Sequence, residues 1–375
     1  MPSFYEFFAG GGMAKAGLGE QWNCLFANDI DRKKADSYAR NWGDEHLAVQ
    51  DVAKLTTQDL PGSTDLVWAS FPCQDLSLAG VGAGLQAKRS GAFWPFWGLV
   101  CDLTAAGRGP KIVVLENVVG ALHSHKGKDF AAIAQAFSDI GYRFGALVIN
   151  AVDFVPQSRP RLFIIGVRPD IELPNNLIQP SPHDKWHPKA VLKAHAQLSK
   201  ASAKKWLWWR LPKPEVRQDS LNDLIEEQPT GVRWHTKEET KRLLSMMSEV
   251  NAEKVKDAQK AGRRMVGGVY KRTRNGQQRA EVRFDGVAGC LRTPAGGSSR
   301  QIILVVDGAK VRSRLLSPRE GARLMGLDES YSLPTRYNDA YHLTGDGVAV
   351  PVVRFLAQHL FEPVLKLDSA GRSAA

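Results

Sequence analysis

The chain has 375 residues, of which 43% are hydrophobic and 24% charged, a composition that is ordinary for a globular protein and excludes a disordered one. No uninterrupted apolar run approaches membrane-spanning length, and the opening MPSFYEFFAGGG lacks the features of a signal peptide. Cys24, Cys73, Cys101 and Cys290 lie far apart without metal-ligand spacing. We therefore expect no metal site, no membrane partner and a reducing, cytoplasmic compartment.

Positive charge is concentrated in one internal segment. The formal net charge is +11, and residues 175–300 carry 25 Lys and Arg against 13 Asp and Glu, whereas the rest of the chain is nearly neutral. The same segment holds five of the ten tryptophans, Trp186, Trp206, Trp208, Trp209 and Trp234. Basic residues interleaved with aromatic ones favour a polyanionic partner with flat bases, such as a nucleic acid. A solvated basic face with core tryptophans is the alternative.

The first 170 residues alternate short apolar runs with helical patterns. The runs are SFYEFF, CLFAND, DLVWASF, KIVVLENV, GALVINAV and RLFIIGVR. This rhythm predicts a parallel, doubly wound, Rossmann-like α/β sheet, whose ligands bind beyond the carboxyl ends of the strands.

A change of composition after this region marks a second, smaller domain. The stretch RPDIELPNNLIQPSPHD is rich in Pro, Asn and Ser, which is typical of a linker. We therefore expect a cofactor-binding domain over residues 1–172, a basic domain over 173–302, and a C-terminal segment, 303–375, that returns to the first domain.

Two local patterns are predicted within the basic domain. A capping box of Thr236 and Glu239 begins a helical pattern that stops at Gly262. The stretch GGVYKRTRNGQQRAEVRF then reads as a hairpin about Asn275 and Gly276. A two-stranded ribbon of this kind fits a DNA major groove.

A glycine-rich loop follows the first predicted strand. In FFAGGGMAKAGLG, successive glycines allow the backbone to turn and approach a nucleotide-like cofactor. Asp29, after the second strand, is placed to meet a ribose hydroxyl, and Asp51 to meet an adenine amino group, although either residue could instead be a helix cap or a loop carboxylate. The spacing departs from G-x-G-x-x-G, so a nicotinamide cofactor is the weaker interpretation.

Two further strand ends carry candidate chemistry. Cys73 follows Pro72 in SFPCQDLS, ahead of a glycine-rich stretch with Lys88 and Arg89. Nearby cations favour the thiolate form of a cysteine, which is the nucleophilic form. A buried structural cysteine is the alternative. Glu116 ends an apolar run, where a partly desolvated carboxylate suits proton transfer.

A third group of polar residues opens a later strand. Gln157, Arg159 and Arg161 lie in QSRPRLFIIGVR. Alternate arginines at a strand start point to one face and can hold a carbonyl oxygen or a phosphate.

Taken in order, these motifs resemble those of the DNA cytosine-5 methyltransferases. The matching segments are FFAGGGMAKAGL, ANDID, QDV, FPCQDLS, RSGAFW, ENV, QSRPR, RLLSPREGARLMGL and GDGVAVPVV. The resemblance covers the chain outside the basic segment, which falls where that family has its target-recognition domain.

The resemblance implies S-adenosylmethionine as methyl donor, with S-adenosylhomocysteine as product, and a cytosine flipped out of duplex DNA. The Cys73 thiolate would add to C6 and make C5 nucleophilic. Glu116 would protonate or hydrogen-bond N3 and the amino group. Arg161, assisted by Arg159, would hold O2 and its developing negative charge.

The resemblance also implies two sets of binding residues. The donor site would comprise Phe8, Gly10, Gly12, Asp29, Ile30, Asp51, Val52, Pro72, Phe93, Asp346 and Val348. DNA would be contacted by Gln157, Lys271, Arg272, Arg274, Arg292, Thr293, Ser298 and Arg300.

Three residues depart from the family pattern. Met13 replaces a glycine of the first motif, Asp29 stands where a glutamate is commoner, and Asp346 replaces an asparagine near the methionine end of the donor. An extra carboxylate at Asp346 would alter donor affinity.

We expect a monomer that acts on double-stranded DNA in the cytoplasm, associated with the nucleoid, either alone or with a cognate restriction endonuclease. A tRNA cytosine-5 methyltransferase is the nearest alternative, although the basic hairpin favours a duplex groove over unpaired RNA. A catalytically weak DNA-binding regulator on the same scaffold is a second alternative, and a nicotinamide oxidoreductase a third.

Overall fold

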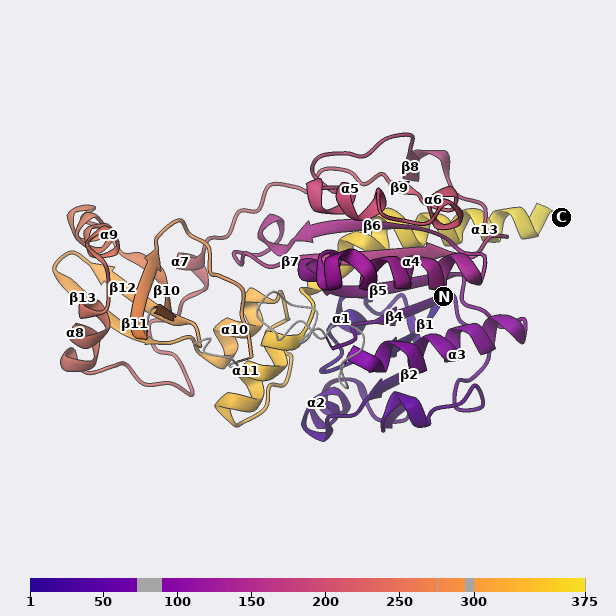
Figure 1. Ribbon diagram of the computed structural model, residues 1–375. Coiled ribbons are helices and arrows are strands. Elements are labelled where there is room, and N and C mark those ends of the chain that lie inside the picture. Colours follow the sequence, from indigo (N-terminus) through magenta and orange to yellow (C-terminus); the bar gives the residue numbers. More distant parts are fainter. Residues whose placement is uncertain (73–89, 275, 294–299, 375) are drawn as a thin grey trace. The chain divides into compact units, whose positions relative to one another are not determined.

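The computed structural model describes residues 1–72, 90–274, 276–293 and 300–374 (Figure 1). The chain divides into two units by its internal contacts. Unit 1 comprises Met1–Asn150, Pro160–Pro214 and Val352–Ala375, and unit 2 comprises Ala151–Arg159 and Glu215–Pro351. The predicted boundaries differ: residues 173–214 group with unit 1, and residues 303–351 with unit 2.

Unit 1 is built on a seven-stranded sheet of order β3-β2-β1-β4-β5-β7-β6. Its strands are β1 (Ser3–Phe7), β2 (Asn23–Asp29), β3 (Leu47–Val49), β4 (Leu66–Ala69), β5 (Ile112–Val118), β6 (Arg143–Asn150) and β7 (Pro160–Val167). All six predicted strands are present, and β3 is an additional short one. The sheet is not wholly parallel, because β7 lies between β5 and β6 and pairs with both in antiparallel fashion.

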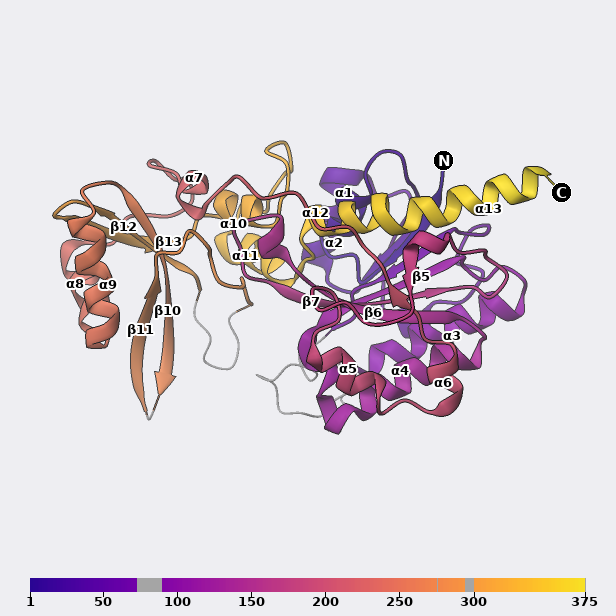
Figure 2. The same cartoon turned by 90° about the horizontal axis from the view of Figure 1, so that it is seen from above.

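Helices cover both faces of this sheet (Figure 2). One face carries α3 and α4, and the other carries α1, α2 and α13, as a doubly wound fold requires. The helices of unit 1 are α1 (Met13–Leu18), α2 (Arg32–Trp42), α3 (Phe93–Ala105), α4 (Lys128–Asp139), α5 (Lys189–His195), α6 (Lys200–Lys204) and α13 (Glu362–Ala374), with α12 (Val350–Leu356) beginning at the unit boundary.

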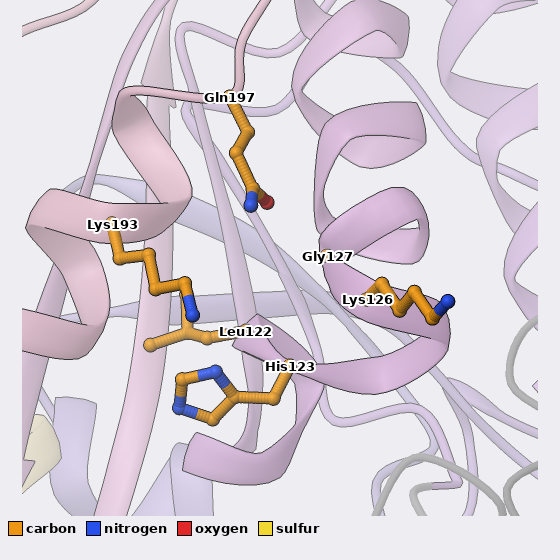
Figure 3. A pocket seen from close by; sticks show the side chains of 6 residues that line it. All are labelled: Leu122, His123, Lys126, Gly127, Lys193 and Gln197. Atoms are coloured by element: carbon orange, nitrogen blue, oxygen red, sulfur yellow. The ribbon is translucent and has the colours of Figure 1, made fainter.

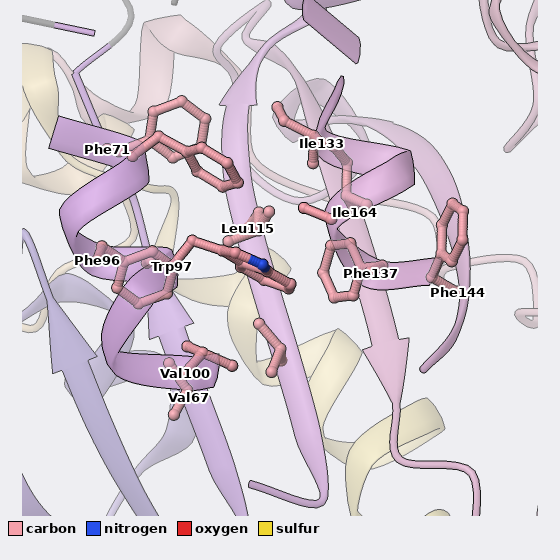
Figure 4. Packing of buried hydrophobic residues seen from close by; sticks show 14 of the residues in the cluster. Val67, Phe71, Phe96, Trp97, Val100, Leu115, Ile133, Phe137, Phe144 and Ile164 are labelled. Atoms are coloured by element: carbon pink, nitrogen blue, oxygen red, sulfur yellow. The ribbon is translucent and has the colours of Figure 1, made fainter. Parts of the chain in front are cut away.

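A large hydrophobic core lies between the sheet and the helices α3 and α4 (Figure 4). Trp97 of α3 meets Phe137 of α4 edge to face, with ring centroids 4.6 Å apart, and Leu115 of β5 belongs to the same cluster. Strands buried on both faces read as continuous apolar runs, and this explains why the sequence signalled them so clearly.

Most tryptophans of the basic segment are core residues. Trp186, Trp206 and Trp209 are buried, and they lie in unit 1. Trp234 of unit 2 lies against the guanidinium groups of Arg312 and Arg314, at 4.2 and 4.9 Å from its ring centroid. The expectation that these rings accompany a nucleic-acid surface is therefore corrected, because burial in the protein has selected them.

Unit 2 contains an antiparallel sheet of order β11-β10-β12-β13. Its strands are β10 (Met265–Arg274), β11 (Gln277–Arg283), β12 (Ile302–Asp307) and β13 (Lys310–Leu315), and its helices are α7 (Leu221–Leu224), α8 (Lys237–Ser245), α9 (Glu249–Lys260), α10 (Pro318–Leu324) and α11 (Tyr337–Asp346). The predicted hairpin is confirmed, since β10 and β11 pair down to Arg274 and Gln277. Asn275 lies outside the described residues.

The helical pattern after Thr236 forms two helices rather than one. The capping box of Thr236 and Glu239 is present at the start of α8. Ser248 then takes an extended N-cap conformation and begins α9. Gly262 follows the end of α9 with a positive φ of 64°, as the sequence predicts.

Short elements complete the two units. A two-stranded sheet is formed by β8 (Ile178–Gln179) and β9 (Trp208–Trp209). The 3₁₀ turns are η1 (Val52–Lys54), η3 (Ser90–Ala92), η4 (Val119–Leu122), η5 (Ser124–Gly127), η6 (Ala151–Asp153) and η7 (Asn175–Leu177), and η8 (Ala357–Phe361) is a π-helical turn.

The helical stretch Tyr337–Gly371 is long and apolar enough to cross a membrane, but 61% of its most apolar window is buried, as in a core helix.

A fully buried ion pair joins β13 to α10 in unit 2. Arg314 donates to both carboxylate oxygens of Glu320, at 2.7 and 2.6 Å, and both side chains are 0% exposed. The Glu320 carboxylate also accepts the backbone N–H groups of Ser317 and Glu226. These contacts satisfy two charges that would otherwise be buried at a large cost.

Removing one partner of this pair should destabilise unit 2 strongly. We expect Arg314→Met to lower the unfolding free energy by about 3–5 kcal/mol, because it leaves the Glu320 carboxylate buried without its counter-charge. Arg233→Met is the matched control, since Arg233 pairs with Glu239 through two similar contacts on the exposed surface. Urea denaturation of both variants measures the difference; equal midpoints would contradict the assignment.

Candidate active site

The glycine loop after β1 is held in one conformation by its neighbours. Phe8, Gly10 and Gly12 all have positive φ angles, of 57°, 57° and 75°. A Cβ at Gly12 would lie 2.3 Å from the indole nitrogen of Trp42, so this position requires glycine. Trp42 also donates from Nε1 to the carbonyl of Gly11, at 3.0 Å. The loop is therefore packed firmly on α2, in the conformation that a close-approaching ligand needs.

Asp29 fastens this loop to the end of β2. Its Oδ2 accepts the N–H of Gly10 at 2.7 Å, and its Oδ1 accepts the N–H of Asp31 at 2.8 Å. Burial raises the pKa of the Asp29 carboxyl. Beside it, Ile30 is 67% exposed. Asp51 caps η1 by accepting the N–H of Ala53. Asp29 is a loop carboxylate and not a helix cap, because Asp31 is the N-cap of α2.

The remaining donor-site candidates of unit 1 differ in exposure. Phe93 is wholly buried and stacks on Trp97, with centroids 5.7 Å apart, and Val52 is buried as well. Pro72 is exposed. Phe93 and Val52 are therefore packed inside unit 1, whereas Ile30 and Pro72 are open to solvent.

Glu116 and Arg161 meet at the carboxyl end of β5. Arg161 Nε lies 3.1 Å from Glu116 Oε1, and both side chains are largely buried. The antiparallel register explains the pairing: Val118, two residues after Glu116, lies opposite Arg161 at the start of β7. The pair places an acid and a guanidinium at the sheet edge where doubly wound folds bind ligands.

Arg159 and Gln157 lie in unit 2 and make other contacts. The buried guanidinium of Arg159 donates to the carbonyl oxygens of Leu291, Gly345 and Gly347. Gln157 is also buried; its amide donates to Leu324 O and accepts from Leu291 N. These contacts favour a positioning role for both residues over direct contact with a base or with DNA.

Several predicted residues lie outside the described part of the chain. Cys73, Lys88, Arg89 and Ser298 are among the residues that the structure does not describe. Arg274 is the last residue of β10, but its side chain is not described. The predicted roles of these residues stay predictions.

The basic hairpin of unit 2 presents different residues on its two faces. Arg272 lies opposite Arg279 in the register, and Lys271 lies opposite Ala280. Ala280 belongs to the hydrophobic cluster under α8 and α9, so Lys271 shares the core side, whereas Arg272 and Arg279 share the exposed face. Arg279 was missed in the sequence because it stands after the turn, apart from the KRTR run.

The last candidates lie around α11 in unit 2. Thr293 donates its hydroxyl to Asp346, which is exposed at the end of α11. Val348 is buried. Arg292 is exposed, and Arg300 bonds to Asn338 at 2.6 Å while its guanidinium lies 5.7 Å from the Tyr337 ring centroid.

A buried carboxyl before the glycine loop was missed by the sequence reading. Glu6 of β1 is 2% exposed, and burial raises its pKa to about 8, against the opposing effect of Lys15. Its Oε2 has no hydrogen-bond partner among the described residues. The available signal was a single acid inside the apolar strand SFYEF.

Polar side chains of α1 and α2 lie in the same region. Lys15 lies 3.1 Å from His46 Nε2, and Tyr38 Oη lies 2.9 Å from the same nitrogen. Lys15 also lies over the rings of Tyr38 and Trp42.

Within the described ranges, no group of three or more His, Cys, Asp or Glu side chains could hold a metal ion.

Comparison with known proteins identifies the class to which this fold and site belong. The family model of the C-5 cytosine-specific DNA methylases matches residues 3–362. The chain therefore belongs to this family and is a DNA cytosine-5 methyltransferase. The family implies use of S-adenosylmethionine.

Relatives and solved structures agree with this assignment. The chain is 26% identical to the type II methyltransferase M.DsaV of Dactylococcopsis salina, over 95% of this chain and 85% of the relative. It is 25% identical to M.HhaI of Haemophilus parahaemolyticus, over 95% and 93%. The S. pombe Dnmt2 methyltransferase has the same fold, with a TM-score of 0.61, 17% identity, and coverage of 97% of this chain and 99% of that one.

The buried Glu6 carboxyl should make stability fall as pH rises. Its folded-state pKa of about 8 lies above the ordinary 4.5, so between these values the folded chain keeps a proton that the unfolded chain has released. The unfolding free energy therefore falls with rising pH across this window. Glu6→Gln cannot titrate, so its stability relative to the unmodified chain should rise by on the order of a few kcal/mol between about pH 5 and 8.

Urea denaturation at stepped pH measures this difference. Glu20→Gln makes the same chemical change at an exposed position and serves as control. Stability curves for Glu6→Gln and the unmodified chain that stay parallel across the pH range would show that Glu6 does not hold a proton in the folded state.

Proposed function

We propose that this enzyme transfers a methyl group from S-adenosylmethionine to C5 of a cytosine flipped out of duplex DNA, at a specific sequence. The observation that carries the proposal is the Glu116–Arg161 pair at the carboxyl end of β5, in a chain whose family acts on C5 of cytosine. Flipping is needed because the reacting atoms cannot be reached from both faces within stacked bases.

The covalent step is assigned to Cys73. Its thiolate adds to C6, forming an S–C6 bond while the C5–C6 double-bond electrons move toward C5. Glu116 protonates or hydrogen-bonds N3 and the exocyclic amino group, and Arg161 holds O2, where negative charge develops. S-adenosylmethionine, when bound, supplies the methyl group to C5. A base then removes the C5 proton, the double bond re-forms and Cys73 leaves as thiolate.

The residues around the glycine loop fit the donor. Phe8, Gly10 and Gly12 hold the backbone in left-handed conformations, and Ile30 offers an exposed apolar side chain beside Asp29 that an adenine ring would cover. Asp51, Val52, Pro72 and Phe93 complete the part assigned to unit 1. Asp346 and Val348 are assigned to the methionine end of the donor.

The partner is proposed to be double-stranded DNA, contacted by the basic hairpin of unit 2 and by Arg292, Thr293, Ser298 and Arg300. The type II methyltransferases among the relatives support a restriction-modification role, with a cognate endonuclease, or a solitary one. A monomeric enzyme in the cytoplasm, associated with the nucleoid, is part of the same proposal.

Replacing the proposed nucleophile should abolish methyl transfer. We expect Cys73→Ala to remove incorporation of labelled methyl groups into mixed-sequence duplex DNA, because no S–C6 bond can form. Cys101→Ala is the matched control: this thiol lies in α3, and burial raises its pKa. Bisulfite sequencing of the product reveals the target site.

The same assay separates the alternatives. Incorporation that persists in Cys73→Ala would sink the covalent mechanism. Methylation of tRNA with none of DNA would favour a tRNA cytosine-5 methyltransferase, and DNA binding without any incorporation would favour a regulator.

The exposed face of the hairpin should contribute to DNA affinity through phosphate contacts. We expect the double variant Arg272→Ala/Arg279→Ala to reduce the slope of log affinity against log salt by about two, because two phosphate-neutralising charges are lost. Lys310→Ala, at the opposite edge of the same sheet, is the control. Binding by fluorescence anisotropy across a salt series measures the slope, and an unchanged slope in the double variant would refute the contact.

A further inference from the structure

A basic pocket opens in unit 1 close to the end of β5 (Figure 3). It has a volume of about 340 Å³ and is lined by Leu122, His123, Lys126, Gly127, Lys193 and Gln197. Its walls come from η4, the η5 turn before α4, and α5 with the residues that follow it. The lining includes two lysines and a histidine but no carboxylate.

Lys193 is available for an external anion in this pocket. Figure 3 shows the amino group of Lys193 ending beside Leu122 and the His123 ring, with the Gln197 amide pointing toward the same space, whereas the Lys126 side chain points away from them. In the part of the chain that the structure describes, neither Lys126 nor Lys193 forms an ion pair. A cation without a protein counter-charge and an amide donor are typical components of a phosphate site.

The backbone at this pocket is held in an uncommon conformation. His125, Lys126 and Gly127 have consecutive positive φ angles of 45°, 61° and 90°. Left-handed non-glycine residues are strained and cluster at functional sites. A contact of 2.9 Å between His125 and Asp129 holds the turn, and a Cβ at Gly127 would lie 2.2 Å from Gln197 Oε1.

This turn also leaves the start of a helix uncapped. Gly127 is the N-cap of the 12-residue helix α4 and provides no side-chain hydrogen bond. The first backbone N–H groups of α4 therefore lie at the pocket wall that Gly127 forms. The Asp129 carboxylate lies in the same first turn, where it is buried and contacts His125. The Lys193 ammonium and the backbone N–H groups of this helix start favour the same kind of ligand, an anion.

We propose that this pocket is a phosphate-binding subsite that takes a backbone phosphate of the DNA substrate; the assignment rests on the proposed function. Leu122 follows Glu116 by six residues, so the pocket rim lies within roughly 20 Å of the proposed base contact even for a fully extended chain. A phosphate held there would fix the register of the strand beside the flipped base, because phosphate contacts position a duplex without reading its sequence.

The experiment measures DNA affinity across a salt series for Lys193→Ala. Loss of one phosphate contact should weaken binding several-fold and reduce the salt slope by about one. Lys189→Ala is the matched control, because Lys189 lies one turn earlier on α5 and does not line the pocket. Both lysines are exposed, and thermal melting verifies that each variant is folded.

The outcomes separate this subsite from the proposed function and from a free anion. A salt slope of Lys193→Ala equal to that of the unmodified enzyme overturns the subsite, even where the unmodified enzyme methylates DNA. A second outcome is that inorganic phosphate stabilises the unmodified enzyme but not Lys193→Ala, while the salt slope of DNA binding is the same for both. This outcome assigns the pocket to a small phosphate and overturns the DNA contact. Failure of the unmodified enzyme to methylate DNA counts against the proposed function alone.

Discussion

The antiparallel insertion of β7 between β5 and β6 is the constraint on which the site depends. Parallel strands present their carboxyl ends at one edge of a sheet, so a residue at the start of a parallel strand would lie at the far edge. Because β7 runs the other way, its first residues return to the edge where β5 ends. Arg161 Nε therefore lies 3.1 Å from Glu116 Oε1. An acid and a cation from distant parts of the sequence form an ion pair.

Neighbouring arginines in the chain then acquire different tasks. Arg161 lies in β7 and forms an ion pair with Glu116. Arg159 lies before the strand, and its guanidinium donates hydrogen bonds to three backbone carbonyls of unit 2. Carbonyl partners satisfy a buried guanidinium without neutralising it. Arg159 thereby holds the segments near Leu291 and Gly345 in place, and its influence on chemistry would pass through that backbone.

Much of the fold was predictable from the sequence, because strands buried on both faces leave continuous apolar runs and capping residues mark helix starts such as Thr236. The direction of β7 was not, since antiparallel and parallel buried strands have the same composition. The tryptophans gave a wrong prediction of a nucleic-acid surface for a related reason. Trp186 and Trp209 are buried in the core of unit 1, and the charge of neighbouring residues in the sequence does not indicate whether an indole is buried or exposed. Motif residues such as Glu116 and Arg161 were found individually, but their contact depends on register.

The carboxylates around the donor loop illustrate how support and binding are combined. Asp29 uses both oxygens on backbone N–H groups, yet each oxygen keeps a second lone pair that a ribose hydroxyl can occupy. Glu6 lies in β1, just before the loop. Burial raises its pKa to about 8, which favours the neutral acid near physiological pH. A neutral group behind the loop adds no negative field to a cofactor that carries a sulfonium, an ammonium and a carboxylate. In the proposed donor site, an aspartate in place of a glutamate at Asp29 would change reach more than charge, because both side chains are carboxylates.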